Sequence, residues 1–372
     1  MMITDRSRKP FQVGVFSVVK HCYLPRAIAA HPRFDLRCVA DDDNRPDWTH
    51  ERNELFAEEF GIPYLRDVKA AISTQELDAV AVSPEAERHC DLAIRAAEAG
   101  LHVVVDKPLS TRLEECDRLI DAVESNGVAC LVWNRNYLPA LIQAQAAVED
   151  GRLGNLRSIH CDFYFSKDAG PAKGSRRPGD PPINWLERQL EAHADGSDGG
   201  VGTEPLGELQ IEGIYPLAYI GMLANSPVER VFARTATHFH QANADNNVDD
   251  LATVSLEMAN GCVGSLSIGR IGAAAHPDIG EIKLHLLGSE GSLVISEARP
   301  EVAIYARNQP PAEFKRRRIA DENNFLLMEN FAEALDHDRD TILNASDARD
   351  IAATVHAALE SAHSGTVIET TR

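Results

Sequence analysis

The stretch VGVFSVVKHCYLP, residues 13–25, has the pattern of a buried strand followed by a turn and a helix. Residues 13–16 form a short apolar run that is typical of a strand in a parallel sheet, and apolar residues from Leu24 onward indicate a helix. A glycine-rich turn that holds a dinucleotide often joins two such elements, yet residues 17–22 contain no glycine. The stretch therefore predicts a nucleotide-binding scaffold and leaves open whether it still binds a nucleotide.

The alternation of strand and helix continues through the first third of the chain. Helices are predicted at about 24–31, 49–60, 86–99 and 111–126. The predicted strands are short, apolar and largely β-branched, and they are Gln12–Phe16, Leu36–Ala40, Ala79–Val82, His102–Val105 and Ala129–Val132. Repeated strand–helix units predict a doubly wound parallel sheet, which binds its ligands at the carboxyl ends of the strands. We therefore expect a Rossmann-type dinucleotide-binding domain of the α/β class over residues 1–133.

The pattern changes after about residue 150, where strands follow one another without intervening helices. These predicted strands are Leu156–Phe165, Val228–His240, Ala252–Met258, Cys262–Arg270, Ile282–Leu287 and Ser292–Ile295. Asn-Gly and Ser-Glu-Gly turns between them indicate antiparallel hairpins, and helices are predicted at about 323–336 and 345–364. We expect a second, α+β domain over residues 134–372, with a large and mostly antiparallel sheet and with C-terminal helices that return toward the first domain.

Composition limits the partners and the location of the protein. The 37 basic and 57 acidic residues give a net charge of −20, which argues against binding to nucleic acid or to an anionic membrane. No apolar run approaches the roughly 20 residues of a membrane helix, and we expect no secretory signal. The seven cysteines are odd in number and form no CxxC pair, which predicts reduced thiols in a cytoplasm and neither a disulfide framework nor a zinc site.

Two strand ends carry candidate functional groups. Asp41 ends the second strand some 20-odd residues beyond the first turn, where an acid usually binds the ribose hydroxyls of NAD and repels the 2′-phosphate of NADP. Asp41 equally fits the start of a polar loop, since two further aspartates follow it. Lys107 follows the strand in HVVVDKPLS (102–110), and Pro108 restricts its backbone so that the amine can be aimed. A surface lysine that caps a strand end is the alternative.

Several stretches resemble one known family in the same order along the chain. SPEAERHCDLAIRAAEAGLHVVVDKPLS (83–110) resembles the segment of the Gfo/Idh/MocA oxidoreductases that leads into their Glu-Lys-Pro motif. Three further stretches resemble later parts of that family, namely VWNRNYLPALIQAQAAVEDGRLGNLRSI (132–159), NNVDDLATVSLEMANGCVGSL (246–266) and GSEGSLVI (288–295). The resemblance implies an NAD(P)-binding Rossmann domain, a sheet domain that holds a sugar-like substrate, and a homodimer or homotetramer for which an exposed sheet face is a natural surface.

The resemblance also assigns a catalytic helix, with departures from the family's pattern. GELQIEGIYPLA (207–218) matches the family motif Gly-x-x-x-Asp-x-Gly-x-His-x-x-Asp, but Ile211 takes the first Asp position, Tyr215 the His position and Ala218 the last Asp position. A tyrosine has an ordinary pKa near 10 and therefore needs a nearby cation to act as a base. We predict that Tyr215 and Lys107 form the acid–base pair.

Glu212 lies three residues before Tyr215 on nearly the same face of the predicted helix, so it is a candidate replacement for the missing Asp. The alternatives are that Tyr215 only packs in the helix and that Glu212 is solvated.

The remaining site assignments concern the cofactor and the substrate. Aligned with the family, Ser17 and Val19 occupy the first two glycine positions, and Cys22 falls near the third. The predicted cofactor-binding residues are Ser17, Val18, Lys20, Asp41, Ser83, Pro84, Asp106 and Lys107, and the predicted substrate-binding residues are Asn134, Arg135 and Trp185. His238 and His240 alternate along a predicted strand, but without a third ligand we expect no metal site.

Three functions remain open on the sequence. The first is an oxidoreductase that uses NAD, rather than NADP, on a secondary hydroxyl or ketone of a sugar, polyol or glycoside. The second is a redox-neutral lyase, epimerase or glycosidase with tightly bound NAD. The third is a binding or scaffold protein whose site has decayed, which the missing glycines, Asp and His favour. The ordered family motifs favour the first.

Overall fold

The computed structural model describes residues 9–19, 22–165, 205–270, 282–296, 301–306, 312–315 and 320–371. The chain divides into two compact units. Unit 1 contains the described residues up to Asn134 together with Asn324–Arg349. Unit 2 contains the described residues from Arg135 to Asn323 and those from Asp350 onward.

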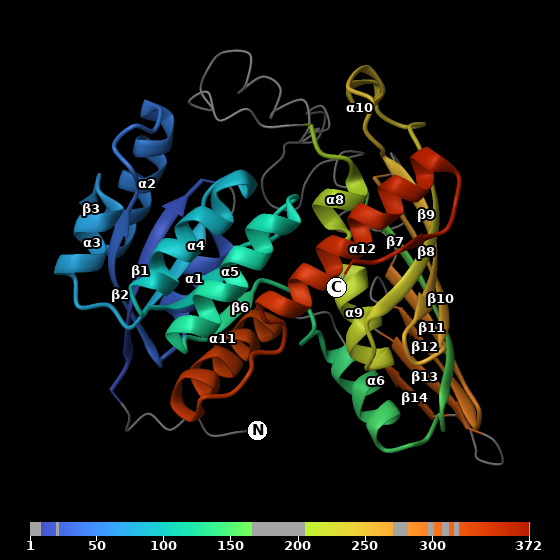
Figure 1. Ribbon diagram of the computed structural model, residues 1–372. Helices are drawn as coiled ribbons and strands as arrows, with labels where there is room; N and C mark the ends of the chain where they lie inside the picture. The colour runs from blue at the N-terminus through green and yellow to red at the C-terminus, as the bar shows by residue number, and fades with distance from the viewer. Residues whose placement is uncertain are drawn as a thin grey trace, which may run out of the picture. The chain divides into compact units, whose positions relative to one another are not determined.

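Unit 1 is built on a six-stranded parallel sheet with the order β3-β2-β1-β4-β5-β6 (Figure 1). Its strands are β1 (Phe11–Val18), β2 (Phe34–Ala40), β3 (Tyr64–Leu65), β4 (Ala79–Ser83), β5 (His102–Val105) and β6 (Cys130–Val132). The connecting helices are α1 (Tyr23–Ala30), α2 (Asp47–Phe60), α3 (Val68–Thr74), a 3-10 turn at Ala86–Arg88, α4 (His89–Glu98) and α5 (Leu113–Asn126). The predicted Rossmann-type fold is therefore confirmed. The strand order reverses between β1 and β4, which makes their carboxyl ends the expected binding crevice.

A segment from far along the chain completes unit 1. From Asn324 on, α11 (Ala320–His337) belongs to this unit, and its Asp336 carboxylate accepts hydrogen bonds of 2.7 and 2.9 Å from the Arg33 guanidinium. Phe331 is fully buried and stacks on Phe34 with 5.8 Å between the ring centroids. Beyond the helix, the Thr341 hydroxyl donates to the carbonyl oxygen of Cys130 on β6 at 2.6 Å. These contacts fasten the C-terminal region to the sheet.

Unit 2 is built on a nine-stranded sheet with the order β14-β13-β12-β11-β7-β10-β9-β8-β15. Its strands are β7 (Leu156–Phe165), β8 (Val228–Ala236), β9 (Leu251–Met258), β10 (Val263–Arg270), β11 (Ile282–Gly288), β12 (Gly291–Ser296), β13 (Glu301–Ala306), β14 (Ala312–Lys315) and β15 (Ile368–Glu369). The β7–β10 pair is parallel and the other described pairs are antiparallel, which confirms the predicted mostly antiparallel sheet. Its helices are α6 (Pro139–Glu149), α8 (Glu208–Glu212), α9 (Ile214–Ala224), α10 (Gln241–Asp245) and, from Asp350 on, α12 (Ala345–Ser364).

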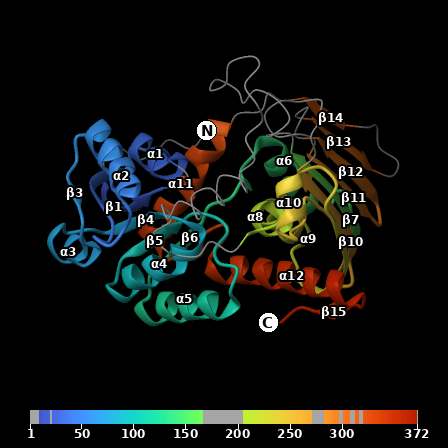
Figure 2. The ribbon, with the colours of Figure 1, turned by 90° about the horizontal axis from the view of Figure 1, so that it is seen from above.

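The two faces of this sheet differ in burial because alternate residues of a strand point to opposite faces. On β7, Ile159, Cys161 and Phe163 are buried, whereas His160 and Asp162 are exposed. Helices α8 and α9 pack on the buried face, and Figure 2 shows them together with α6 on one side of the sheet. On the other face hydroxyl and imidazole groups bridge neighbouring strands, as His160 Nδ1 does with the Ser265 hydroxyl at 2.8 Å.

One strand prediction is wrong at its end. β8 stops at Ala236, so His238 and His240 are not alternate residues of a strand. The reason is the buried Asp250 carboxylate, which accepts hydrogen bonds from the backbone N–H groups of His238, Phe239 and His240 at 2.7 to 3.1 Å. These bonds turn the chain away from the sheet and lead it into α10.

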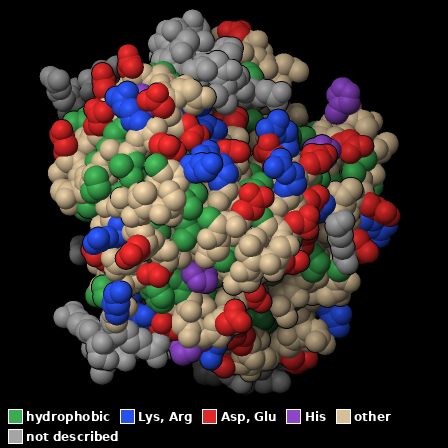
Figure 3. All heavy atoms as spheres, turned by 60° about the vertical axis from the view of Figure 1, so that its left-hand side comes forward, with side chains coloured by type: hydrophobic (Ala, Val, Ile, Leu, Met, Phe, Trp, Pro, Cys, Tyr) green, Lys and Arg blue, Asp and Glu red, His purple; other side chains and the backbone are tan. Residues whose placement is uncertain are grey.

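The described surface carries mixed charge. On the face drawn in Figure 3 the acidic side chains are spread among basic ones and do not form a single patch. Exposed pairs such as Arg26–Glu59 and Arg66–Glu54 are part of this pattern. Within the residues that the structure describes, no helix has both the length and the apolar character that a membrane span requires.

Candidate functional site

The turn after β1 contains a serine in a glycine-like conformation. Ser17 has a φ of 65°, in the left-handed region that non-glycine residues rarely adopt. It is 0% exposed, and its hydroxyl has no hydrogen-bond partner in the described part of the chain. Ser17 therefore reproduces the backbone of the first glycine of a dinucleotide turn and keeps a buried hydroxyl available at the carboxyl end of β1. Its role in cofactor binding stays a prediction.

Side chains and strands around this turn hold the two valines that follow Ser17. The Val18 N–H donates to Oδ1 of Asn53 at 2.7 Å, and the Val19 N–H donates to the carbonyl oxygen of Ser83 on β4 at 3.1 Å. Val19, at the second glycine position, has a buried side chain. The turn is thereby tied to α2 on one side and to β4 on the other. Lys20 lies outside the described residues.

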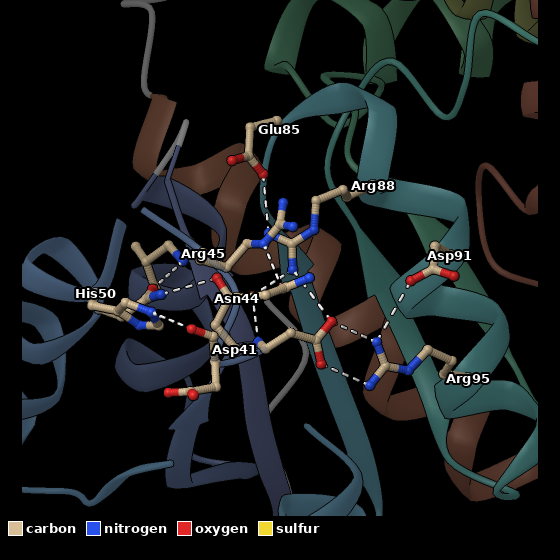
Figure 4. A network of polar contacts seen from close by, with 12 residues as sticks. Asp41, Asn44, Arg45, His50, Glu85, Arg88, Asp91 and Arg95 are labelled. Carbon is tan, nitrogen blue, oxygen red and sulfur yellow. Dashed lines mark hydrogen bonds and ion pairs between the residues drawn. The ribbon is translucent and has the colours of Figure 1, made fainter. Parts of the chain in front are cut away.

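Asp41 lies at the end of β2 and is enclosed by hydrogen-bond donors (Figure 4). Its side chain is 0% exposed. Oδ1 forms an ion pair with the Arg88 guanidinium and accepts from the Asp42 N–H at 2.8 Å, while Oδ2 accepts from Nδ2 of Asn53 at 3.1 Å. A carboxylate has about four acceptor positions, so these three bonds leave one on Oδ2 for a further donor. Asp41 does begin a loop, but its carboxylate is buried and paired rather than exposed, and its role in ribose binding stays a prediction.

Further charges continue this network toward α4. Arg88 also lies 3.2 Å from Oε2 of Glu85, and Arg95 donates two hydrogen bonds of 2.8 and 2.9 Å to the Asp42 carboxylate. The hydrogen bond and charge of Arg95 lower the pKa of Asp42 below its ordinary value. The carboxylates of Asp41 and Asp42 are therefore each paired with an arginine. Sequence reasoning missed Arg88 and Asn53, which lie 47 and 12 positions from Asp41 and carry no motif of their own.

The end of β5 brings three predicted residues together. Lys107 is 3% exposed, and its N–H donates to Oδ1 of Asp106 at 2.8 Å. Oδ2 of Asp106 accepts from the Ser83 hydroxyl at the end of β4 at 3.3 Å, and Pro84 follows Ser83 directly. The Lys107–Pro108 peptide bond is cis. The alternative of a surface lysine is therefore wrong, because Lys107 is buried at the sheet edge where Rossmann folds bind ligands.

The neighbouring end of β6 carries Asn134. Its side chain is buried, and Nδ2 donates to the carbonyl oxygen of Val132 at 2.8 Å. The predicted residues Ser17, Asp41, Ser83, Asp106, Lys107 and Asn134 thus all lie at the carboxyl ends of strands of one sheet. The roles of these residues stay predictions.

In unit 2 the helix pair α8–α9 places Tyr215 beside Arg135. Tyr215 is 4% exposed, its ring lies 4.5 Å from the guanidinium carbon of Arg135, and its centroid lies 6.3 Å from that of Phe163. Gly213 joins the two helices, and a Cβ there would lie 2.2 Å from the carbonyl oxygen of Leu209. The glycine of the motif is therefore required by packing. Lys107 belongs to the other unit, so its pairing with Tyr215 stays a prediction.

A buried charge cluster lies under the same helices. Nε of Arg270, at the end of β10, donates to Oε2 of Glu208 at 2.7 Å, and Nη2 of Arg270 lies 3.7 Å from Oε1 of Glu212. Burial, together with the negative charge of Glu212, raises the pKa of Glu208 to about 7 against the opposing effect of Arg270. Glu212 is buried, so the alternative that it is solvated is wrong. Sequence reasoning did not identify Glu208 or Arg270, and Trp185 lies outside the described residues.

Comparison with known proteins agrees with this arrangement. Residues 13–133 match the profile described as oxidoreductase family, NAD-binding Rossmann fold, and residues 145–370 match the profile of that family's C-terminal alpha/beta domain. Levoglucosan dehydrogenase of Pseudarthrobacter phenanthrenivorans is 26% identical over 64% of this chain and 60% of its own length. The scyllo-inositol 2-dehydrogenase (NAD(+)) of Bacillus subtilis is 25% identical over 73% of this chain and 69% of its own.

Solved structures share the fold over nearly the whole chain. A levoglucosan dehydrogenase in complex with NADH and L-sorbose superposes with a TM-score of 0.77, at 21% identity and over 98% of this chain and 100% of that one. The WlbA dehydrogenase of Bordetella pertussis, in complex with NADH and UDP-GlcNAcA, gives 0.74 at 20% identity, over 98% of this chain and 100% of that one. The two profiles cover most of the chain in order, and the chain belongs to the Gfo/Idh/MocA family of oxidoreductases.

Proposed function

We propose that this protein is an NAD-dependent dehydrogenase that oxidises a secondary hydroxyl of a sugar, polyol or glycoside, or reduces the corresponding ketone. The observation that carries the proposal is the turn after β1, where Ser17 adopts the glycine conformation and buries a hydroxyl without a partner in the described residues. The left-handed backbone and the unsatisfied donor occur together at the switch point of the sheet, and this combination supports a retained phosphate site. The relatives named as sugar and inositol dehydrogenases support the substrate class.

Two places in unit 1 support the binding of a dinucleotide. The N-terminus of α1 and the Ser17 hydroxyl suit the pyrophosphate, and the remaining acceptor position on Asp41 suits one ribose hydroxyl. NAD fits better than NADP because the 2′-phosphate would meet the buried Asp41 carboxylate and its acidic neighbours Asp42 and Glu85. Bound NAD would supply the hydride acceptor.

The chemistry then requires one positioned cation and one proton carrier. When a hydride leaves a carbinol carbon, the hydroxyl proton must go to a base. The buried Lys107 ammonium would orient the hydroxyl, and Tyr215 would accept its proton, with the Arg135 guanidinium over the ring favouring the phenolate. Glu212, buried beside Arg270, would balance charge on the same helix pair.

Turnover and cofactor binding test the proposal separately. Purified protein with NAD and a panel of sugars, polyols and glycosides should accumulate NADH, which a redox-neutral enzyme would not do. Lys107→Met should lower turnover by at least about 10²-fold, the usual size of a lost acid–base contribution, while calorimetry still shows NAD binding. Lys69→Met, at an exposed lysine on α3, is the matched control and should leave turnover unchanged. Full turnover of Lys107→Met would contradict a role for Lys107 in the mechanism. Absence of NAD binding by the unaltered protein would contradict the proposal that it is an NAD-dependent dehydrogenase.

The exposed face of the nine-stranded sheet supports self-association as a dimer or a dimer of dimers. Val263 and Leu287 are both exposed and pair in register with Ser158 from opposite sides, and Phe232 is exposed on the same face. Such apolar groups in an open sheet face favour burial against a second copy. Light scattering should give at least twice the mass of one chain, and Val263→Lys should shift the protein toward monomer. A monomeric unaltered protein would contradict this part.

A further inference from the structure

We propose that Asn53 is a positioning residue that sets the turn after β1 and the Asp41 carboxylate relative to each other. This inference rests on the proposed function, since it places Asn53 behind the same NAD site. Asn53 does not belong to any motif that the sequence singles out, and it lies in the middle of α2, between the two groups that the proposal assigns to the pyrophosphate and to the ribose.

The geometry is a bridge formed by one side-chain amide. Asn53 is fully buried; its Oδ1 accepts from the Val18 N–H at 2.7 Å, and its Nδ2 donates to Oδ2 of Asp41 at 3.1 Å. Val18 and Asp41 lie 35 and 12 positions away from Asn53 in the sequence. A flipped amide would face the Val18 N–H with its NH₂ group and the Asp41 carboxylate with its oxygen. Both contacts would be repulsive, so the network determines the orientation of the side chain.

The two bonds hold the turn and the carboxylate from one side chain. The turn has no glycine, and the Val18 N–H bond anchors it to α2. On Asp41, Arg88 and the Asp42 N–H bond to Oδ1, whereas Oδ2 accepts from Asn53. Asn53 thereby decides in which direction the remaining acceptor position of Oδ2 points. A ribose 2′-hydroxyl can use that position only if the carboxylate keeps this rotation.

The consequence is that one side chain contacts both ends of the proposed adenosine diphosphate site and couples them. A change at Asn53 should therefore alter how well the protein recognises the ribose hydroxyl, and not only how stable it is. If Asn53 had only a structural role, its replacement would change stability but leave the ratio of the affinities for NAD and 2′-deoxy-NAD unchanged.

The test compares NAD with 2′-deoxy-NAD by calorimetry on the full-length protein. Asn53→Asp keeps an acceptor for the Val18 N–H but replaces the amide donor by a second carboxyl group against Asp41, so that the two carboxyl groups repel each other or share a proton. Asn53→Ala removes both bonds. Thr49→Val is the matched control, because Thr49 is buried one turn earlier on α2 and its hydroxyl has no partner in the described residues. Hydrogen exchange at the Val18 amide reports the state of the turn without any cofactor.

The unaltered protein and Thr49→Val should bind NAD at least about 10-fold more tightly than 2′-deoxy-NAD, since a hydrogen bond to a charged group is lost. In Asn53→Asp and Asn53→Ala this ratio should fall to about 3-fold or less. The Val18 amide should stay protected in Asn53→Asp and exchange faster in Asn53→Ala. If either variant does not fold, the other still gives the ratio.

The two proposals fail differently. An unchanged ratio in the Asn53 variants, together with normal NAD binding by the unaltered protein, would overturn the role of Asn53 and leave the dehydrogenase intact. An unaltered protein that binds neither dinucleotide would overturn both.

Discussion

Replacing Ser17 by glycine should make the cofactor-free protein more stable and at the same time weaken its binding of NAD. Ser17 carries two separate costs in the structure, a left-handed backbone at φ 65° and a buried hydroxyl without a partner in the described residues. The backbone cost for a residue with a Cβ is about 1–2 kcal/mol. The buried, unsatisfied hydroxyl costs about 1–3 kcal/mol.

Glycine removes both costs and introduces two smaller ones. It loses about 0.5–1 kcal/mol of backbone entropy on folding, and the missing methylene gives up about 0.8 kcal/mol of burial. The balance favours Ser17→Gly by about 2 kcal/mol in the absence of cofactor. Because each kcal/mol shifts the Tm of a domain of this size by about 2–4 °C, the Tm should rise by about 4–8 °C.

Bound cofactor narrows this difference in stability, since the Ser17 hydroxyl then gains a phosphate partner that glycine lacks. NAD should therefore bind Ser17→Gly more weakly by about 1 kcal/mol, or about 5-fold. Ser17→Ala separates the causes, because alanine keeps the backbone strain and lacks the hydroxyl. Thermal unfolding by circular dichroism and NAD calorimetry on the three proteins give the answer. A lower Tm for cofactor-free Ser17→Gly would refute the strain argument, and equal NAD affinity in all three would refute the hydroxyl contact.

Three further predictions concern stability. Gly213→Ala should destabilise unit 2 by about 1–3 kcal/mol through its clash with the preceding turn, whereas the control Gly221→Ala, with open space around its Cβ, should stabilise it by up to about 1 kcal/mol in thermal unfolding. The pKa of Glu208 in the folded protein is about 7, above its ordinary value, so the unaltered protein loses stability as the pH rises toward 7. The difference in Tm between Glu208→Gln and the unaltered protein should therefore increase in favour of the variant from about pH 5 to about pH 8. A Tm difference that does not change with pH would contradict this. Arg88→Met should lower the free energy of unfolding in urea by about 3–5 kcal/mol, because it leaves the buried Asp41 carboxylate without its cation. Adding Asp41→Asn should recover part of that loss, and an Arg88→Met protein as stable as the unaltered one would contradict the prediction.

The fold could be predicted where local patterns are strong. The apolar runs of β1, β2, β4 and β5 and the amphipathic α4 and α5 carry clear periodic signals, and all of them are present. α9 carries no such signal, because it is buried on nearly every side and therefore shows no polar stripe; only the family resemblance predicted it. β3 has two residues, too few for any periodicity to show.

The candidate site could be predicted only in part, for a geometric reason. Asp41 and Lys107 stand at strand ends, and in a parallel sheet all carboxyl ends meet at one edge, so sequence position alone brings them together. Arg88 and Asn53 reach Asp41 from elements elsewhere in the chain, through side-chain directions that no spacing rule encodes. The burial of Glu208 beside Arg270 depends likewise on a helix packed on a distant strand.

The glycine-free turn shows how such long-range contacts replace a local motif. In the usual turn three glycines supply a left-handed residue, a close approach to the pyrophosphate and a close helix–strand contact. Here Ser17 supplies the left-handed residue at a cost in strain, and the bonds from Val18 to Asn53 and from Val19 to Ser83 hold the following backbone. The strain is tolerated because contacts from α2 and β4 over-determine the turn. The absence of glycine therefore says that the conformation is enforced from outside the turn, and it does not by itself argue that nucleotide binding has been lost.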